Sequence, residues 1–399
     1  MPTEDIAKKQ TSSAQGERID ARSGKDEHQI RKAAASTNRI QSPGLARKAS
    51  TRPDPTPAPD MTEPVLPHKA RTAPAPASGS TRSQELNSLI GQTNRLALKR
   101  KHIVKSVAFI SNKGGVGKTH ISANMAFYLG RIGKKSLLID LDLGNSDVTN
   151  KLGFFCDNTI VDLLHGQRAV SQLVYSAPYG FDVIGGEAGD LRLANMNSMQ
   201  RSRFIKAFNE LGRDYDFIMY DLSAGINTIT LDFALAQDYQ IIITTPQDIV
   251  AGYACIKAAF NRFCELEDSM KERNPDYQPQ KVFRPFIVVN QVDDFRSGRD
   301  LFQRMKEVVR QNLAVHPRYG IQTLFLGAVV SDQERIRESE LNRRLYCSDY
   351  GASQTGQCFN FLSHNLAKYR DPNDITFTNK LRRFIDIFMK SVGETKYAQ

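Results

Sequence analysis

The sequence predicts an α/β fold with one doubly wound, mostly parallel sheet of about seven or eight strands. From Ile103 onward, short apolar runs rich in β-branched residues alternate with stretches of helical periodicity. Strands that alternate with helices form right-handed crossovers, and these produce a parallel sheet. The runs are continuously apolar, which is typical of strands buried on both faces.

The predicted strands are residues 106–110, 136–141, 181–184, 217–220, 240–245, 286–290 and 324–330. Helical periodicity is clear over residues 119–131 and 249–266. Ligands of such sheets bind at the carboxyl ends of the strands. We therefore expect the polar residues that end these runs to lie together in space.

The rest of the chain differs in composition. Residues 1–82 are rich in Ser, Thr, Pro, Ala and charge, and are predicted to be a disordered basic arm. Residues 83–103 carry scattered leucines and predict a linker with a short helix. Residues 104–370 form the predicted α/β domain. Residues 371–399 hold a predicted C-terminal amphipathic helix.

Charge and cysteine content narrow the class of protein. Residues 1–106 hold 19 of the 54 Lys/Arg and 10 of the 43 Asp/Glu, so this N-terminal part of the chain carries +9 of the formal charge of +11. The nearly neutral remainder argues against a nucleic-acid partner. The five cysteines form no metal-binding spacing, and reduced thiols in the cytoplasm are expected. No apolar run is long enough to predict a membrane span.

A glycine-rich loop joins the first predicted strand to the first predicted helix. It reads Lys113-Gly114-Gly115-Val116-Gly117-Lys118-Thr119, and His120 follows it. Glycines let the backbone curl so that successive N–H groups point at phosphate oxygens, and the helix N-terminus adds its dipole. Lys118 would neutralise the β- and γ-phosphates, and the Thr119 hydroxyl would ligate magnesium. Residues 114–120 are therefore the predicted phosphate site.

Acidic residues end two of the predicted strands. Asp140 and Asp142 lie two positions apart, so they share one side of the second strand. Asp221 follows four mostly apolar residues, which is the Walker B pattern. Such positions suit a magnesium ion and an attacking water. Strand-end capping is the alternative role for each acid.

Lys113 makes the loop unusual. An extra lysine before Gly-Gly resembles the deviant Walker A motif of the MinD/ParA superfamily, a MinD-like (SIMIBI) branch of the P-loop NTPases. The resemblance implies ATP or ADP with Mg²⁺ as ligands. It also implies an ATP-dependent homodimer, in which Lys113 reaches the partner's phosphates. Lys113, Lys118 and Asp142 are thus the expected catalytic residues, with Asp142 positioning or activating the water.

The same resemblance assigns the remaining site residues. Thr119, Asp140 and Asp221 are expected around the metal. Asn290 ends the strand 286–290, where the superfamily binds the adenine edge with an asparagine. An amide offers both a donor and an acceptor, which suits adenine. An ordinary turn asparagine is the alternative.

Several segments look most like the flagellar-number regulators FlhG/FleN, which are MinD relatives. Residues 183–189 resemble a Gly-Gly-Ser-Gly turn of that group, and residues 221–227 resemble its Asp-Thr-Gly-Ala-Gly-Ile-Ser segment. Two departures stand out. Ser223 replaces a usual glycine, and Ser83-Gln84-Glu85 only echoes the motif that stimulates a partner GTPase.

The segment 377–392 has apolar residues at helical spacing, flanked by Lys and Arg. A basic amphipathic helix suits an anionic membrane surface. A terminal helix packed on the sheet is the alternative, and periodicity alone does not separate the two. The resemblance favours peripheral attachment to the inner face of the cell membrane. A dimer presenting two such helices would bind far better than a monomer.

The function expected from these observations is that of an ATP hydrolase. It would be a slow, switch-type ATPase that regulates the number or placement of flagella. Its partners would be a second copy, a flagellar-placement GTPase or flagellar switch and regulator proteins. The alternatives are a MinD-type division-site ATPase or a ParA-type ATPase that positions DNA or other cargo. A bacterial tyrosine kinase is disfavoured, because the C-terminal region has only scattered tyrosines.

Overall fold

A computed structural model describes residues 104–142, 148–186, 200, 203–204, 207, 210–212, 214–313 and 316–371. The predicted arm at 1–82 and the linker at 83–103 lie outside the described residues. So does the predicted C-terminal helix at 377–392.

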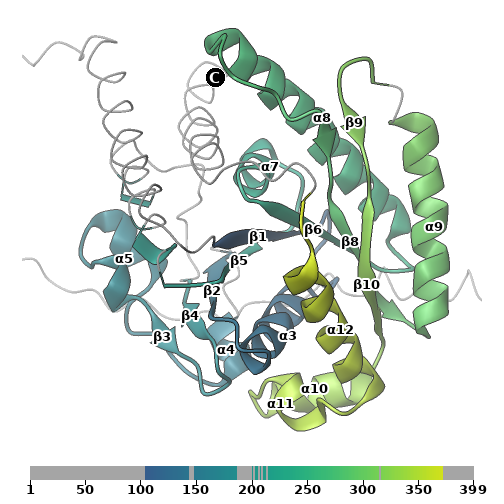
Figure 1. The fold of residues 1–399 in the computed structure, drawn as a ribbon. Coiled ribbons are helices and arrows are strands. Elements are labelled where there is room, and N and C mark those ends of the chain that lie inside the picture. Colours follow the sequence, from purple (N-terminus) through teal and green to yellow (C-terminus); the bar gives the residue numbers. More distant parts are fainter. Residues whose placement is uncertain are drawn as a thin grey trace, which may run out of the picture. The chain divides into compact units, whose positions relative to one another are not determined.

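One sheet of eight strands forms the centre of the described fold (Figure 1). Across the sheet the order is β10 (Leu324–Val330), β8 (Phe286–Val292), β6 (Tyr239–Thr244), β1 (Lys105–Ile110), β5 (Phe217–Leu222), β2 (Ser136–Leu141), β4 (Asp182–Ile184) and β3 (Tyr175–Ser176). All neighbours pair in parallel except β3 with β4. The prediction of a mostly parallel sheet of seven or eight strands is confirmed.

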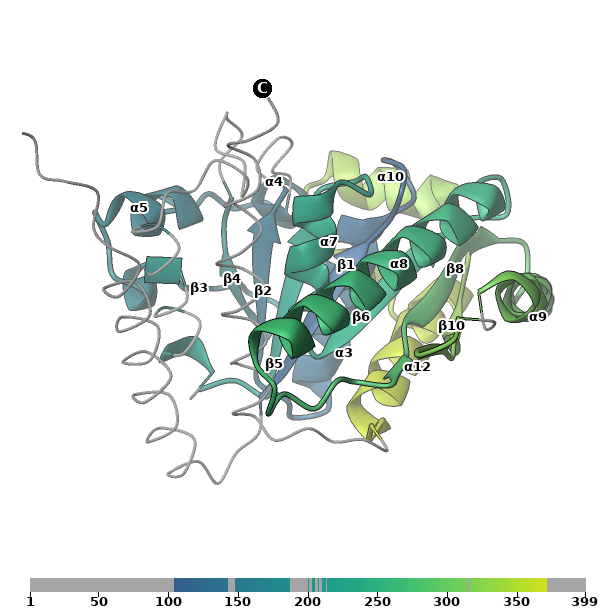
Figure 2. The same cartoon turned by 90° about the horizontal axis from the view of Figure 1, so that it is seen from above.

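Helices cover both faces of this sheet. α3 (Lys118–Arg131) and α12 (Gln354–Lys368) pack together on one face, and α7 (Thr228–Leu235), α8 (Ile249–Arg273) and α9 (Phe295–Asn312) pack on the other (Figures 1 and 2). The smaller elements are α4 (Val148–Leu152), α5 (Ile160–His165), η1 (Val170–Gln172), α10 (Gln333–Leu341), α11 (Tyr346–Tyr350) and a separate pair of short strands, β7 (Val282–Phe283) with β9 (Gly320–Ile321).

Two-sided burial explains the composition of the central strands. Every residue of β2, β5 and β6 is buried, as the continuous apolar runs predict. The two-residue strands β3, β7 and β9 are not among the predicted strands, because two residues carry no periodicity. β8 extends two residues beyond its predicted end at Asn290. That extension lies beside the phosphate loop.

Candidate nucleotide site

The predicted phosphate loop curls between β1 and α3. Gly115 and Gly117 have φ angles of 77° and 91°, a left-handed conformation that favours glycine. Gly117 is the N-cap residue of α3, so the loop ends at the helix N-terminus. The Val116 side chain is buried and anchors the loop, whereas Gly114 and Gly115 are exposed. This arrangement presents main-chain N–H groups and a helix dipole to an anion.

A buried polar cluster lies at the start of α3. Lys118 is 7% exposed and Asp221 is 1% exposed. The Thr119 side chain hydrogen-bonds Asp221. Asp140 lies directly beside Asp221, because β2 and β5 pair these two residues in register. The structure thus brings together the lysine, the threonine and two of the acids that the sequence singles out.

The buried carboxylate of Asp221 is only partly hydrogen-bonded. Its Oδ1 atom is buried and has no hydrogen-bond partner among the described residues. Burial, and next the Asp140 carboxylate, raise the pKa of Asp221 to about 7, against the Thr119 hydrogen bond and the Lys118 charge. Two adjacent carboxylates and a threonine hydroxyl supply the hard oxygen ligands that Mg²⁺ prefers, and the Oδ1 atom of Asp221 has no hydrogen-bond partner in the described residues.

The residues therefore fit a magnesium ion that shares its ligands with a nucleotide. In the described part of the chain, no group of three or more His, Cys, Asp and Glu could hold a metal ion. Phosphate oxygens and water would have to complete the coordination, as Mg²⁺ usually requires. Thr119 and Asp221 would hold the ion, which would neutralise charge on the phosphates.

We expect Asp221→Asn to remove a pH dependence of stability from the metal- and nucleotide-free protein. The folded pKa of about 7 lies above the usual 3.8. Between these values the folded state keeps a proton that the unfolded chain has lost. The free energy of unfolding therefore falls as pH rises from about 4 to about 7, by about 3 kcal/mol. Urea titrations at about pH 5 and about pH 8 measure the free energy of unfolding at each pH. The same decrease between these two pH values in wild type and variant would contradict the prediction.

Asp140 is tied to the backbone that follows β2. Its Oδ1 accepts from the Asp142 N–H at 3.1 Å, and its Oδ2 accepts from the Val148 N–H at 3.2 Å. Val148 begins α4, so this carboxylate fixes both ends of the segment between β2 and α4. Residues 143–147 of that segment lie outside the described residues. Asp142 keeps its side chain partly exposed, where water can reach it.

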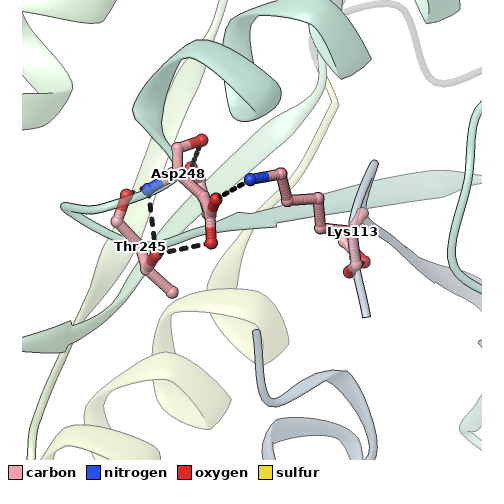
Figure 3. A network of polar contacts seen from close by, with 5 residues as sticks. Lys113, Thr245 and Asp248 are labelled. Carbon is pink, nitrogen blue, oxygen red and sulfur yellow. Dashed lines mark hydrogen bonds and ion pairs between the residues drawn. The ribbon is translucent and has the colours of Figure 1, made fainter. Parts of the chain in front are cut away.

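The Lys113 side chain is paired with a carboxylate of its own chain. Its Nζ forms an ion pair with Asp248 Oδ1, as Figure 3 shows. Asp248 precedes α8 and is itself fixed by Thr245, whose Oγ1 lies 3.4 Å from Asp248 Oδ2 and accepts from the Asp248 N–H at 3.2 Å. The Lys113 side chain remains 59% exposed. It is therefore held at the surface by a single exposed ion pair.

The side chains of two predicted binding residues contact other parts of the protein. The Asn290 amide donates to the Val116 carbonyl oxygen at 2.8 Å, so Asn290 contacts the phosphate loop itself. The His120 ring packs edge-on against Tyr346 and Phe359. Burial lowers the pKa of His120 to about 4. Any contact of His120 with a nucleotide would therefore come from its main chain.

The structure adds residues that the sequence does not indicate. Asp248 meets Lys113 across 135 residues of chain, and Gln291 lies against the loop from the end of β8. Neither belongs to a motif. Gly225, in the loop after β5, has a φ of 115° and donates its N–H to the Ser111 carbonyl oxygen at 2.9 Å. The loop after β5 thus contacts the start of the phosphate loop.

Several known proteins are similar to this chain in sequence. A family model described as an AAA domain matches residues 104–272. Antiactivator FleN of Pseudomonas aeruginosa is 25% identical over 273 residues, covering 68% of this chain and 89% of FleN. The flagellum site-determining protein YlxH of Helicobacter pylori is 27% identical over 268 residues, covering 66% of this chain and 83% of YlxH.

The septum site-determining protein MinD of Bacillus subtilis is 25% identical over 237 residues, covering 59% of this chain and 79% of MinD. Among solved structures, the septum site-determining protein MinD of Pyrococcus horikoshii complexed with Mg-ADP is 21% identical. It covers 67% of this chain and 97% of its own, with a TM-score of 0.49. The sequence matches confirm the predicted resemblance to the MinD/ParA superfamily, and the chain is similar to FleN, YlxH and MinD.

Proposed function

We propose that this protein is an ATP-hydrolysing switch that dimerises with ATP and regulates the number or placement of flagella. The observation that carries the nucleotide part is the buried cluster at the start of α3. There Lys118 and Thr119 lie beside Asp221, whose buried carboxylate keeps one oxygen without a hydrogen-bond partner in the described residues. The relatives support ATP hydrolysis in general. The names of FleN and YlxH support the flagellar part.

In this proposal the residues have separate tasks. The loop N–H groups and Lys118 bind the phosphates, and Thr119 with Asp221 holds Mg²⁺. Asp142 orients the attacking water. Slow hydrolysis resets the switch, because the dimer needs the γ-phosphate. Lys113 is the residue proposed to cross the dimer, and its exposed ion pair with Asp248 is weak enough to exchange.

A prediction follows for that ion pair. Replacing Asp248 with asparagine removes the ion pair of Lys113. The Lys113 side chain then no longer has to break this ion pair before it contacts the second copy of the dimer. We expect ATP-dependent dimers to form at a concentration a few-fold lower, within the range of an exposed pair. Analytical ultracentrifugation with ATP over a protein dilution series measures this. Glu307→Gln, which breaks an exposed pair with Arg310, is the matched control. Dimerisation that is unchanged or weakened by Asp248→Asn would count against the assignment.

Membrane attachment through residues 377–392 remains part of the proposal. None of the described helices is both long and apolar enough to cross a bilayer. Pelleting with anionic liposomes, with and without ATP, tests the attachment. The full chain should pellet more with ATP than without. A chain ending at Asp371 should stay in the supernatant in both conditions.

The second candidate is a MinD-type switch at the division site, and the match to B. subtilis MinD supports it. Deleting the gene in the organism that carries it distinguishes the flagellar role from the division role. Extra or misplaced flagella with normal septa support the flagellar role. Misplaced septa with normal flagella support the division role and overturn the flagellar one. In vitro, ATP hydrolysis by the full chain tests the activity common to both.

A further inference from the structure

Two neighbouring side-chain amides at the end of β8 hold two neighbouring carbonyls of the phosphate loop. Asn290 Nδ2 donates to the Val116 oxygen at 2.8 Å, and Gln291 Nε2 donates to the Gly115 oxygen at 3.4 Å. The contacts join segments more than 170 residues apart in sequence. The approach is close, because a Cβ on Gly117 would lie 2.4 Å from Asn290 Nδ2. The end of β8 is therefore fitted against this loop.

A β-bulge places Gln291. Asn290 pairs with Val329 and Val292 pairs with Val330, so Gln291 is the extra residue in the register. Its φ is 58°, and only one other described non-glycine residue, Arg343, has a positive φ. Bulges near functional sites redirect a side chain, and a non-glycine residue at positive φ costs conformational energy. The strand keeps this costly conformation at the position where the side chain reaches the loop.

The contacts determine which way the loop amides face. In a planar trans peptide unit, the carbonyl of one residue and the N–H of the next point in opposite directions. Holding the Gly115 and Val116 carbonyls toward β8 therefore turns the N–H groups of Val116 and Gly117 away from β8. Successive N–H groups turned to one side form the concavity that binds anions. Amides fixed before a ligand arrives need less ordering when it binds.

We propose that Gln291 is a positioning residue for nucleotide binding, which orients the Val116 N–H toward the phosphates through the Gly115 carbonyl. The inference rests on the proposed function, because it presupposes a nucleotide in the loop. Gln291 need not touch the nucleotide. Asn290 does the same for the Gly117 N–H through the Val116 carbonyl.

Two variants of Gln291 separate positioning from mere stability. Gln291→Met keeps the side-chain length and the strained backbone but removes the donor. Gln291→Gly removes the donor and also relieves the positive φ. We expect both to weaken ADP binding in the presence of Mg²⁺ about fivefold, the effect of one hydrogen bond. Isothermal titration calorimetry on the full chain measures the affinity, and thermal unfolding without nucleotide measures Tm.

Arg343 supplies the matched control. It has a φ of 49° and follows α10, where its N–H donates to the Glu340 carbonyl oxygen at 3.1 Å. Arg343→Gly relieves the same kind of strain with no contact to the loop. We expect its Tm to stay level or rise, as for Gln291→Gly, while its affinity for ADP is unchanged. Only Gln291→Gly should combine an undiminished Tm with weaker binding.

The outcomes are distinct. Wild-type affinity in both Gln291 variants would overturn the positioning role while leaving the proposed function intact. Weaker binding only in the variant whose Tm falls would also overturn it, because stability would then explain the loss. A wild-type chain with no affinity for ADP or ATP would overturn the proposed function itself.

Discussion

Replacing Lys118 with alanine is expected to abolish binding of ATP and ADP, with a loss of affinity of about 100-fold or more. Lys118 is the first residue of α3, directly after the phosphate loop, and only 7% of the residue is exposed. A hydrogen bond from a charged donor contributes about 1.5–3 kcal/mol, and two of them to phosphate correspond to at least this factor. Direct titration with ADP and Mg²⁺ measures the loss.

The Lys118 variant should remain folded. The deleted cation lowers the pKa of Asp221, so its removal should favour the protonated form of that carboxyl rather than leave an unpaired charge. The matched control is Lys306→Ala on α9, which removes an exposed lysine from a helix that contacts β8 and β10. If Lys118→Ala bound ADP within about threefold of wild type, the assignment of residues 113–119 as a nucleotide loop would be wrong.

The positions of the main elements could be predicted because their signals are local. β2 and β10 have the predicted bounds, since each is a mostly apolar run with polar residues directly before and after it. The glycine loop and Thr119 are contiguous, so their spacing is visible in the sequence. Asp140 and Asp221 are recognisable as strand-end acids. Their adjacency follows once β2 and β5 are neighbours.

The contacts that refine the site could not be predicted, because they depend on pairs distant in sequence. The bulge at Gln291 exists only through the register between β8 and β10. The position of Lys113 depends on Asp248, a residue before a different helix with no motif around it. The family resemblance places Asn290 at the adenine edge, and that role stays a prediction. The structure shows that its amide already donates to the Val116 carbonyl.

The Asp142→Ala variant is expected to bind ATP but to hydrolyse it about 100-fold more slowly or worse, so that ATP-bound dimers accumulate. Asp142 follows β2, and its N–H is held by Asp140 Oδ1 at 3.1 Å, which fixes its main chain at the edge of the acidic cluster. The side chain is partly exposed, unlike the buried Asp140 and Asp221. A carboxylate that water can reach, beside a metal site, suits the orientation of an attacking water, and such groups contribute about 10²–10⁴ in rate.

This expectation separates hydrolysis from binding. Phosphate release should fall in Asp142→Ala, while the affinity for ADP with Mg²⁺ stays near that of wild type, because Thr119 and Asp221, the residues proposed to hold the metal, are unchanged in this variant. Asp276→Ala, an exposed acid between α8 and β7, is the control and should change neither quantity. Light scattering with saturating ATP should show the variant as a dimer. A monomeric Asp142→Ala with ATP bound would refute the assigned role, because a switch that cannot hydrolyse its ligand should stay in the state that the ligand stabilises.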